Sequence, residues 1–175
     1  GEGNYPTDMN GAAAQSSFYK KNFEQYQNRI RLALEELIKS GANPDKIVVI
    51  GYCFGGTGAI ETFRGNLPVK GVVSFHGGLG KVGDRVTKNS VTKVLVCHGA
   101  DDPYESQEEI KAFQNEMRES KADWQMIYYA NAVHSFTNPE AGNDNSKGAA
   151  YNEKADKRSW EHLLVFLKEI LKSNP

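Results

Sequence analysis

The sequence has few cysteines, no long apolar run and no excess of charge of either sign. Cys53 and Cys97 are the two cysteines in 175 residues, which is too few for a disulfide scaffold, and we expect free thiols in a reducing compartment such as the cytoplasm. No segment approaches the ~20 apolar residues of a membrane-spanning helix, and the start of the chain is too polar for a signal peptide, although a targeting signal upstream of Gly1 would not be visible. A formal net charge of −1 argues against nucleic acid or an anionic membrane as a partner.

What the sequence does have is an alternation of apolar strands and amphipathic helices over the length of a single domain, residues 1–175. Short apolar runs predict buried strands at residues 46–53, 69–78, 93–99 and 124–130. Helical spacing predicts helices from Asn22 to a stop at Gly41, from 54 to 64, from 106 to 120, and near the C-terminus. The last helix is expected to bury a stripe of Trp160, Leu163, Leu164, Leu167, Ile170 and Leu171. This order predicts an α/β fold with a parallel sheet and helices on both faces.

The first strand runs into GYCFGG, residues 51–56, which places Cys53 in a G-x-C-x-G turn. This spacing is typical of a nucleophile elbow, a sharp strand-to-helix turn that sets the nucleophile at a helix N-terminus, where the pKa of a thiol falls. A packed structural cysteine is the plainer alternative, but it needs no glycines on both sides. A phosphate loop would need a lysine or the G-x-G-x-x-G order. Cys53 is therefore the candidate nucleophile.

Two later strand ends carry groups that complete a catalytic set. The third strand is followed by Asp101 and Asp102, of which Asp102 is the candidate acid, although paired acids before a proline are common in solvated turns. The fourth strand is followed by His134, and a lone histidine among apolar neighbours is often a core residue. However, Cys53, Asp102 and His134 follow the nucleophile, acid and base order of α/β-hydrolases, which favours the catalytic interpretation.

The motifs GYCFGG, SFHGGL, VCHGADDP and HSFTNPE together resemble the dienelactone hydrolase family, cysteine-dependent α/β-hydrolases, over essentially the whole chain. The resemblance implies hydrolysis of a small-molecule carboxylic ester or lactone, with no cofactor and no metal. It implies that Cys53 is the nucleophile, that His134 is the general base and that Asp102 orients His134. The backbone N–H of Phe54 would supply one donor of the oxyanion hole.

The candidate substrate-binding residues are Tyr52, His76, Phe136 and Asn138. His76 lies at a strand end but not after the last strand, so we expect it to line the pocket, and for the same reason we expect His98 to be structural. Family members that hydrolyse dienelactone itself have an arginine where this chain has Asn138. A neutral amide cannot form the charge-assisted pair with a substrate carboxylate, so an anionic lactone is not assumed.

The resemblance also implies that the N-terminal part of the fold is absent, because only the last four of eight strands can be recognised. Residues 1–21 would then form a loop, and the strand at 46–53 would be a sheet edge. The second oxyanion donor and a family glutamate that helps to control the thiol's protonation would both be missing.

Three classes of function remain. The first is a thiol-dependent ester or lactone hydrolase with a Cys-His-Asp triad. The second is a catalytically weak or inactive fragment that forms a homodimer or higher oligomer through its exposed sheet edge. The third, a redox thiol protein, is disfavoured because Cys53 and Cys97 lack the C-x-x-C spacing.

Overall fold

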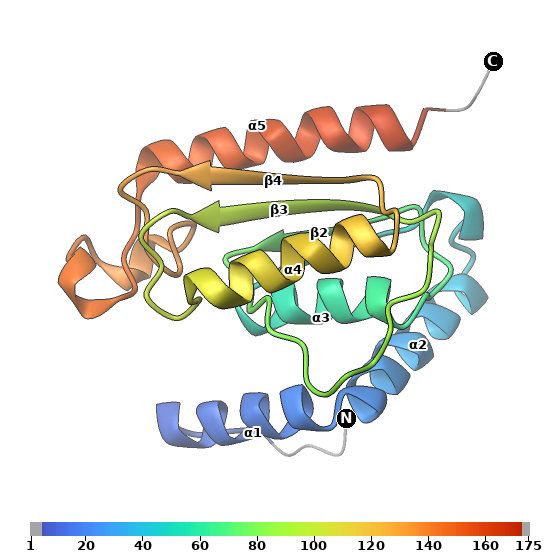
Figure 1. The fold of residues 1–175 in the computed structure, drawn as a ribbon, viewed down its shortest axis with the longest axis horizontal. Helices are drawn as coiled ribbons and strands as arrows, with labels where there is room; N and C mark the ends of the chain where they lie inside the picture. The colour runs from blue at the N-terminus through green and yellow to red at the C-terminus, as the bar shows by residue number, and fades with distance from the viewer. Residues whose placement is uncertain (1–4, 173–175) are drawn as a thin grey trace.

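The computed structural model describes residues 5–172, and its centre is a parallel sheet with the strand order β1-β2-β3-β4 (Figure 1). The strands are β1 (Val48–Tyr52), β2 (Gly71–Phe75), β3 (Lys93–Gly99) and β4 (Trp124–Tyr129). Each strand pairs with the next in parallel; Tyr52, for example, lies opposite Phe75, and Phe75 lies opposite Cys97. The carboxyl ends of all these strands therefore lie at one edge of the sheet, where ligands bind in open α/β folds.

The helices that alternate with the strands lie close to their predicted positions. They are α2 (Phe23–Lys39), α3 (Phe54–Arg64), α4 (Gln107–Glu119) and α5 (Glu153–Ile170), with short 3-10 turns at Pro44–Lys46, Pro139–Ala141 and Asn145–Lys147. A capping box starts α4: the Ser106 hydroxyl accepts a hydrogen bond from the Glu109 N–H, and the Glu109 carboxylate accepts one from the Ser106 N–H. Beyond α2, Gly41 has a φ of +99°, a conformation that ends a helix at little cost only for glycine.

Helices cover both faces of the sheet and enclose two apolar cores (Figure 1). On one face, α2, α3 and α4 pack over strand residues that include Val72 and Val94. On the other face, α5 packs over their sequence neighbours Val73 and Leu95. Successive strand residues thus enter opposite cores, which explains why the strands are unbroken apolar runs rather than alternating ones.

The prediction of a loop before α2 is wrong. A helix, α1, spans Met9–Lys21 and begins where the Asp8 carboxylate accepts a hydrogen bond from the Gly11 N–H. None of its residues is buried, and it lies beyond α3, away from the sheet (Figure 1). Because α1 buries no apolar face, its sequence has no apolar periodicity from which a helix could be predicted. The first four residues of the predicted loop lie outside the described part of the chain.

The predicted buried stripe of α5 is correct only in part. Leu163 is buried and Leu167 packs against the core, but Trp160 and Leu164 are 51% and 43% exposed. Phe166, absent from the prediction, is buried instead. A single helix that packs on a sheet buries only a narrow face. In α5 this face includes Leu163 and Phe166, and it is narrower than the whole set of apolar residues in the helix.

Strand β1 forms an edge of the sheet, as predicted, and its residues Ile50 and Tyr52 are 41% and 42% exposed. Across residues 5–172 no helix combines the length and the apolar character needed to cross a bilayer.

Candidate active site

Cys53 lies in a sharp turn between β1 and α3. Its backbone has φ of 50° and ψ of −119°, a strained conformation for a non-glycine residue, and it is the N-cap of α3. Two glycines make this turn possible. A Cβ on Gly51 would lie 1.9 Å from the carbonyl oxygen of Gly55, and one on Gly56 would lie 2.7 Å from the Ser74 hydroxyl. Gly51 and Gly56 are therefore steric requirements of the turn, whereas a Cβ on Gly55, the second glycine of the G-x-C-x-G spacing, would meet nothing within 4 Å.

Contacts from two other elements hold the turn in place. The Cys53 N–H donates to the carbonyl of Phe75, at the end of β2, over 3.1 Å. On the opposite side, the Tyr26 hydroxyl of α2 donates to the carbonyl of Phe54 over 2.8 Å, and the two rings stack at 4.7 Å. As the first residue of α3, Phe54 has a backbone N–H with no carbonyl partner inside the helix.

Asp102 and His134 come together at the same edge of the sheet. The Nδ1 atom of His134 lies 3.0 Å from Oδ2 of Asp102, whose other carboxylate oxygen accepts the Tyr104 N–H over 2.9 Å. Asp102 is buried, whereas its competitor Asp101 is exposed. A short parallel bridge to Ala149 fixes the His134 backbone: its N–H donates to the carbonyl of Gly148, and its carbonyl accepts from the N–H of Ala150. Of the two acids, only Asp102 is therefore placed to orient the imidazole.

The environment of Cys53 favours its thiolate. Burial by itself raises the pKa of the Cys53 thiol, but hydrogen bonds with His134, His76 and Ser135 outweigh burial and lower the pKa to about 5. Burial lowers the pKa of His134, but hydrogen bonds with Asp102 and Cys53 outweigh burial and raise the pKa to about 9. Between these two values the stable state is a Cys53 thiolate beside a His134 imidazolium, so the thiol proton already resides on His134.

His76 lies much closer to the thiol than its predicted role as a pocket wall suggests. Its Nδ1 atom is 3.4 Å from the Cys53 Sγ, and its Nε2 atom is 2.8 Å from the Thr137 hydroxyl. Ser135, which the sequence reasoning missed, places its hydroxyl 3.4 Å from the same sulfur. Both residues have positive φ angles, 39° for His76 and 57° for Ser135. His76 directly follows β2, and Ser135 lies in the loop after β4, next to His134. These positions were the signal in the sequence for a contact with the thiol.

The other predicted substrate-binding residues differ in their exposure and in their contacts with His76. The buried Phe136 ring meets His76 edge-on at 5.0 Å, and the half-exposed Tyr52 ring lies 6.0 Å from it. Asn138 is exposed, and its side chain accepts a hydrogen bond from Glu140, so it caps its own turn. His98, which we expect to be structural, is buried.

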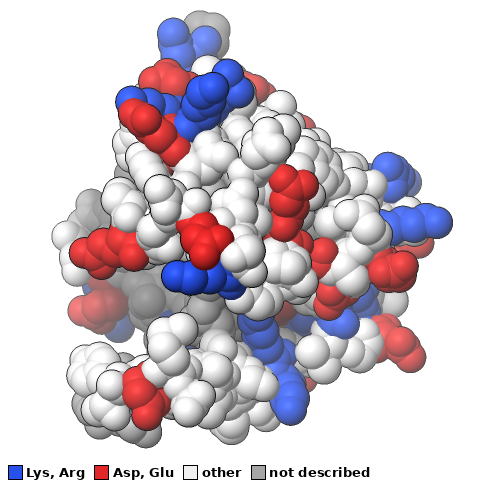
Figure 2. Space-filling view, turned by 90° about the vertical axis from the view of Figure 1, so that its left-hand side faces the viewer, with Lys and Arg blue, Asp and Glu red and all other residues white. Residues whose placement is uncertain are grey.

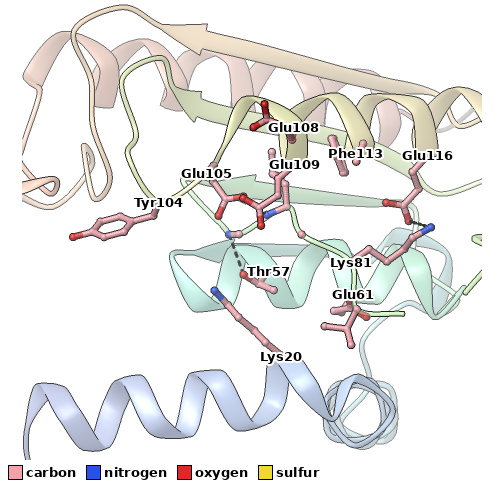
Figure 3. Close-up of a pocket in the computed structure, with 15 residues that line it drawn as sticks. Lys20, Thr57, Glu61, Lys81, Tyr104, Glu105, Glu108, Glu109, Phe113 and Glu116 are labelled. Carbon is pink, nitrogen blue, oxygen red and sulfur yellow. Dashed lines mark hydrogen bonds and ion pairs between the residues drawn. The ribbon is translucent and has the colours of Figure 1, made fainter. Parts of the chain in front are cut away.

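A cavity of about 570 Å³ opens beside the candidate site, between α1, α3 and α4 (Figure 3). Thr57, one turn after Cys53, lines it, and so does Tyr104, whose ring meets the His134 ring edge-on at 5.3 Å. The remaining polar lining consists of glutamates and two lysines: Glu61, Glu105, Glu108, Glu109, Glu116, Lys20 and Lys81. Figure 2 looks onto the strand ends and shows the hollow between α1, below, and the rest of the molecule.

A parallel sheet with helices on both faces and a cysteine in a strand-to-helix elbow defines an α/β-hydrolase-like protein. The dienelactone hydrolase family profile matches residues 3–171, and the chain belongs to this family.

Two solved structures and one curated sequence are similar to this chain. A dienelactone hydrolase-like promiscuous phosphotriesterase from metagenomic libraries is 37% identical, with a TM-score of 0.83 over 93% of this chain and 69% of its own. The protein m3DLH is 32% identical, with a TM-score of 0.88 over 98% of this chain and 72% of its own. An uncharacterized protein of Caenorhabditis elegans is 35% identical over 126 residues, which are 71% of this chain and 80% of that protein. Family and neighbours support a hydrolase of the dienelactone hydrolase type.

Proposed function

We propose that the chain is a thiol-dependent hydrolase of a carboxylic ester or lactone, with Cys53 as nucleophile, His134 as acid and base, and Asp102 as the residue that orients His134. One observation carries the proposal, the surroundings of Cys53. The residue has a strained backbone at the N-terminus of α3, and its thiol pKa is lowered to about 5. It lies beside His134, whose Nδ1 atom is 3.0 Å from the buried carboxylate of Asp102. A cysteine that served only for packing would need neither the strained turn nor the two histidines.

The chemistry proceeds through a thioester. The Cys53 thiolate attacks the carbonyl carbon, and the C=O electron pair moves to oxygen, where the Phe54 N–H donates a hydrogen bond to the oxyanion. The oxyanion collapses, the C–O bond to the leaving group breaks, and the His134 imidazolium gives its proton to the leaving alkoxide. Neutral His134 then takes a proton from water, the resulting hydroxide attacks the thioester, and the acid product leaves as Cys53 returns to the thiolate.

The substrate is expected to be a neutral ester or lactone. Asn138 supplies no charge for a substrate carboxylate and uses its side-chain oxygen within its own turn. Half-exposed Tyr52 lies near His76 and offers apolar ring surface on the approach to the thiol, whereas Phe136 has no exposed surface and packs in the core beside His76. A similar protein is described as a promiscuous phosphotriesterase, so an activated phosphotriester is a second substrate to assay.

The test is hydrolysis of p-nitrophenyl acetate, followed by mass spectrometry of the quenched protein. We expect a burst of p-nitrophenol and an acetyl group on the peptide that contains Cys53, with none on the peptide that contains Cys97. The Cys97→Ala variant should keep both signals, and the Cys53→Ala variant should lose both. Turnover that persists in Cys53→Ala, or acetylation at another residue, would overturn the proposal.

The exposed edge of the sheet favours a second candidate function, association with another copy of the chain. Strand β1 is rich in β-branched residues and lacks proline, and its Ile50 and Tyr52 side chains are exposed. If an oligomer forms there, Cys53 lies directly beyond the paired strand and hydrolysis is expected to be weak. Sedimentation equilibrium at micromolar concentration tests this, with Ile50→Lys as the variant that disfavours pairing. A monomer with good esterase activity would reject the second candidate.

Both cysteines are free, Cys53 half-buried and Cys97 buried. Free thiols favour a reducing compartment such as the cytoplasm as the place where this chemistry occurs.

A further inference from the structure

We propose that Cys53, His76 and His134 also form a binding site for Zn²⁺, and that the bound ion blocks the nucleophile. Each residue offers one ligand atom, and these atoms all lie within 4.8 Å of one another. In a tetrahedral zinc site, with Zn–S of about 2.3 Å and Zn–N of about 2.0–2.1 Å, ligand atoms stand roughly 3.3–3.6 Å apart. The Cys53 Sγ and His76 Nδ1 atoms are already 3.4 Å apart. The other separations need to close by no more than about 1.5 Å to match this geometry.

The hydrogen bonds around the two histidines turn one ring nitrogen of each toward the sulfur. In the metal-free site, Nδ1 of His76 shares its proton with the Cys53 thiolate. Zinc binding displaces that proton and requires the tautomer with the proton on Nε2, whose Nδ1 accepts the Cys53 N–H over 3.3 Å. That N–H also has the Phe75 carbonyl as a partner at 3.1 Å, so it stays satisfied if a metal takes the Nδ1 lone pair. Nδ1 of His134 faces Asp102, which leaves its Nε2 for the shared space.

Each histidine also has the outer partner that metal-bound imidazoles require. Asp102 holds His134 at 3.0 Å, and the Thr137 hydroxyl holds His76 at 2.8 Å. In metalloproteins such partners fix the tautomer and the orientation of the ring, and their loss typically weakens metal binding 10–100-fold. The site therefore has three ligand atoms and two of the groups that support them.

The ligand types select the ion. One thiolate and two imidazoles suit Zn²⁺, whereas Mg²⁺ and Ca²⁺ prefer oxygen ligands. Three protein ligands leave a fourth position for water. The site is also accessible, because the side chain of His134 is 23% exposed and Cys53 is only half-buried.

Zinc would stop the ester chemistry for two reasons: a zinc-bound thiolate is a weaker nucleophile than a free one, and the ion also occupies the His134 nitrogen that serves as acid and base. This inhibition rests on the proposed function, whereas the binding itself does not. The two are therefore tested by separate measurements.

The binding test is a titration of the full chain with Co²⁺, followed by displacement with Zn²⁺. Thiolate ligation gives a charge-transfer absorption band, and we expect one Co²⁺ per chain and a band that disappears as Zn²⁺ is added. The His76→Ala variant should bind at least a hundredfold more weakly. The matched controls His162→Ala, which removes a histidine of α5, and Cys97→Ala should bind as the unmodified chain does.

A second variant separates a zinc site from a general loss of structure. Thr137→Val keeps the size of the side chain and all three ligands but removes the hydroxyl that orients His76, and we expect binding to weaken about tenfold. Absence of a charge-transfer band, or equal affinity in His76→Ala and His162→Ala, would overturn the site.

The inhibition test measures p-nitrophenyl acetate hydrolysis at increasing free Zn²⁺. The rate of the chelator-treated protein should fall at least tenfold, with half-inhibition at the Zn²⁺ dissociation constant from the displacement experiment. Hydrolysis that is unchanged or raised by bound Zn²⁺ would overturn the inhibition. A chelator-treated protein without any hydrolysis would instead count against the proposed function, and the cobalt spectrum would still decide the site.

Discussion

Cys53 and Cys97 have the same side chain but lie in opposite surroundings. Cys53 lies beyond the end of β1 at a helix N-terminus, where two histidines and a serine reach its sulfur and its pKa falls to about 5. Cys97 lies inside β3 with no exposed surface, and burial raises its pKa to about 12, against a partial opposing effect of a hydrogen bond from Tyr129. A thiol becomes reactive here by its position relative to the strand end, because only that edge of the sheet brings polar groups from several loops together.

The largest expected difference between the two sites is in catalysis. Cys53→Ser should keep the fold and lower kcat/KM for p-nitrophenyl acetate on the order of 10⁴-fold, because the site ionises a thiol but not a hydroxyl. Cys97→Ala should stay within about twofold of the unmodified chain, since that sulfur touches none of the reacting atoms. Steady-state kinetics with circular dichroism as the folding control measures this. If Cys53→Ser is as active as the unmodified chain, the argument that the reaction depends on a Cys53 thiolate is wrong.

The next effect separates the two neighbouring acids. Asp102→Asn should lower kcat/KM on the order of 10³-fold, because the neutral amide does not stabilise the His134 imidazolium and its NH2 group can hold the wrong tautomer of His134. Asp101 is exposed, and Asp101→Asn should stay within about twofold. Both variants are compared on p-nitrophenyl acetate. Similar losses in the two would leave the acid unassigned.

Alkylation compares the thiols directly and gives the pH dependence. At pH 7, iodoacetamide should label Cys53 on the order of a hundredfold faster than Cys97, because the thiolate predominates only at Cys53. The sign follows from the lowered pKa: the rate at Cys53 should rise with pH and reach half its plateau near pH 5, the pKa of its thiol. Timed quenching and mass spectrometry give both rates. A half-point near pH 8–9, the range of an ordinary thiol, would show that the histidines do not act on the sulfur.

The smallest effect concerns stability. Cys97→Ala removes a buried sulfur from the core under α5, and we expect the free energy of unfolding to fall by about 1 kcal/mol and Tm to fall by about 2–4 °C. Urea denaturation and differential scanning calorimetry measure these changes. A variant with unchanged stability would mean that the core refills the space.

The elements with strong periodic patterns could be predicted from the sequence. Strand β3 and the capping box of α4 lie where the apolar run and the Ser106–Glu109 spacing put them, because local rules suffice for both. Helix α1 could not be predicted, because its stability does not depend on a buried apolar face. Trp160 was misplaced for a related reason: the sequence shows which residues are apolar, but not how many of them a sheet can cover.

The residues of the candidate site also divide into those that could be predicted from the sequence and those that could not. The G-x-C-x-G spacing indicated Cys53, and the turn requires Gly51 of that spacing for steric reasons. The order of the strand ends selected Asp102 and His134. The contacts of His76 and Ser135 with the sulfur could not be derived, because they depend on the register of β2 beside β1 and on the path of the loop that follows β4 at the opposite edge of the sheet. Register between strands far apart in the sequence is a property of the folded sheet.

The positive φ angles of Cys53, His76 and Ser135, 50°, 39° and 57°, have a consequence for protein engineering. A left-handed conformation costs a non-glycine residue roughly 1–2 kcal/mol, so glycine at the half-buried position 135 would relieve strain while it removed a hydroxyl that touches the sulfur. At position 76 the side chain is only 2% exposed, and the cavity left by its loss would outweigh the relief of strain. Laboratory evolution for heat resistance alone is therefore expected to select glycine at position 135 and to keep His76. A library screened for both heat resistance and activity should divide into robust, slow variants and fragile, fast ones.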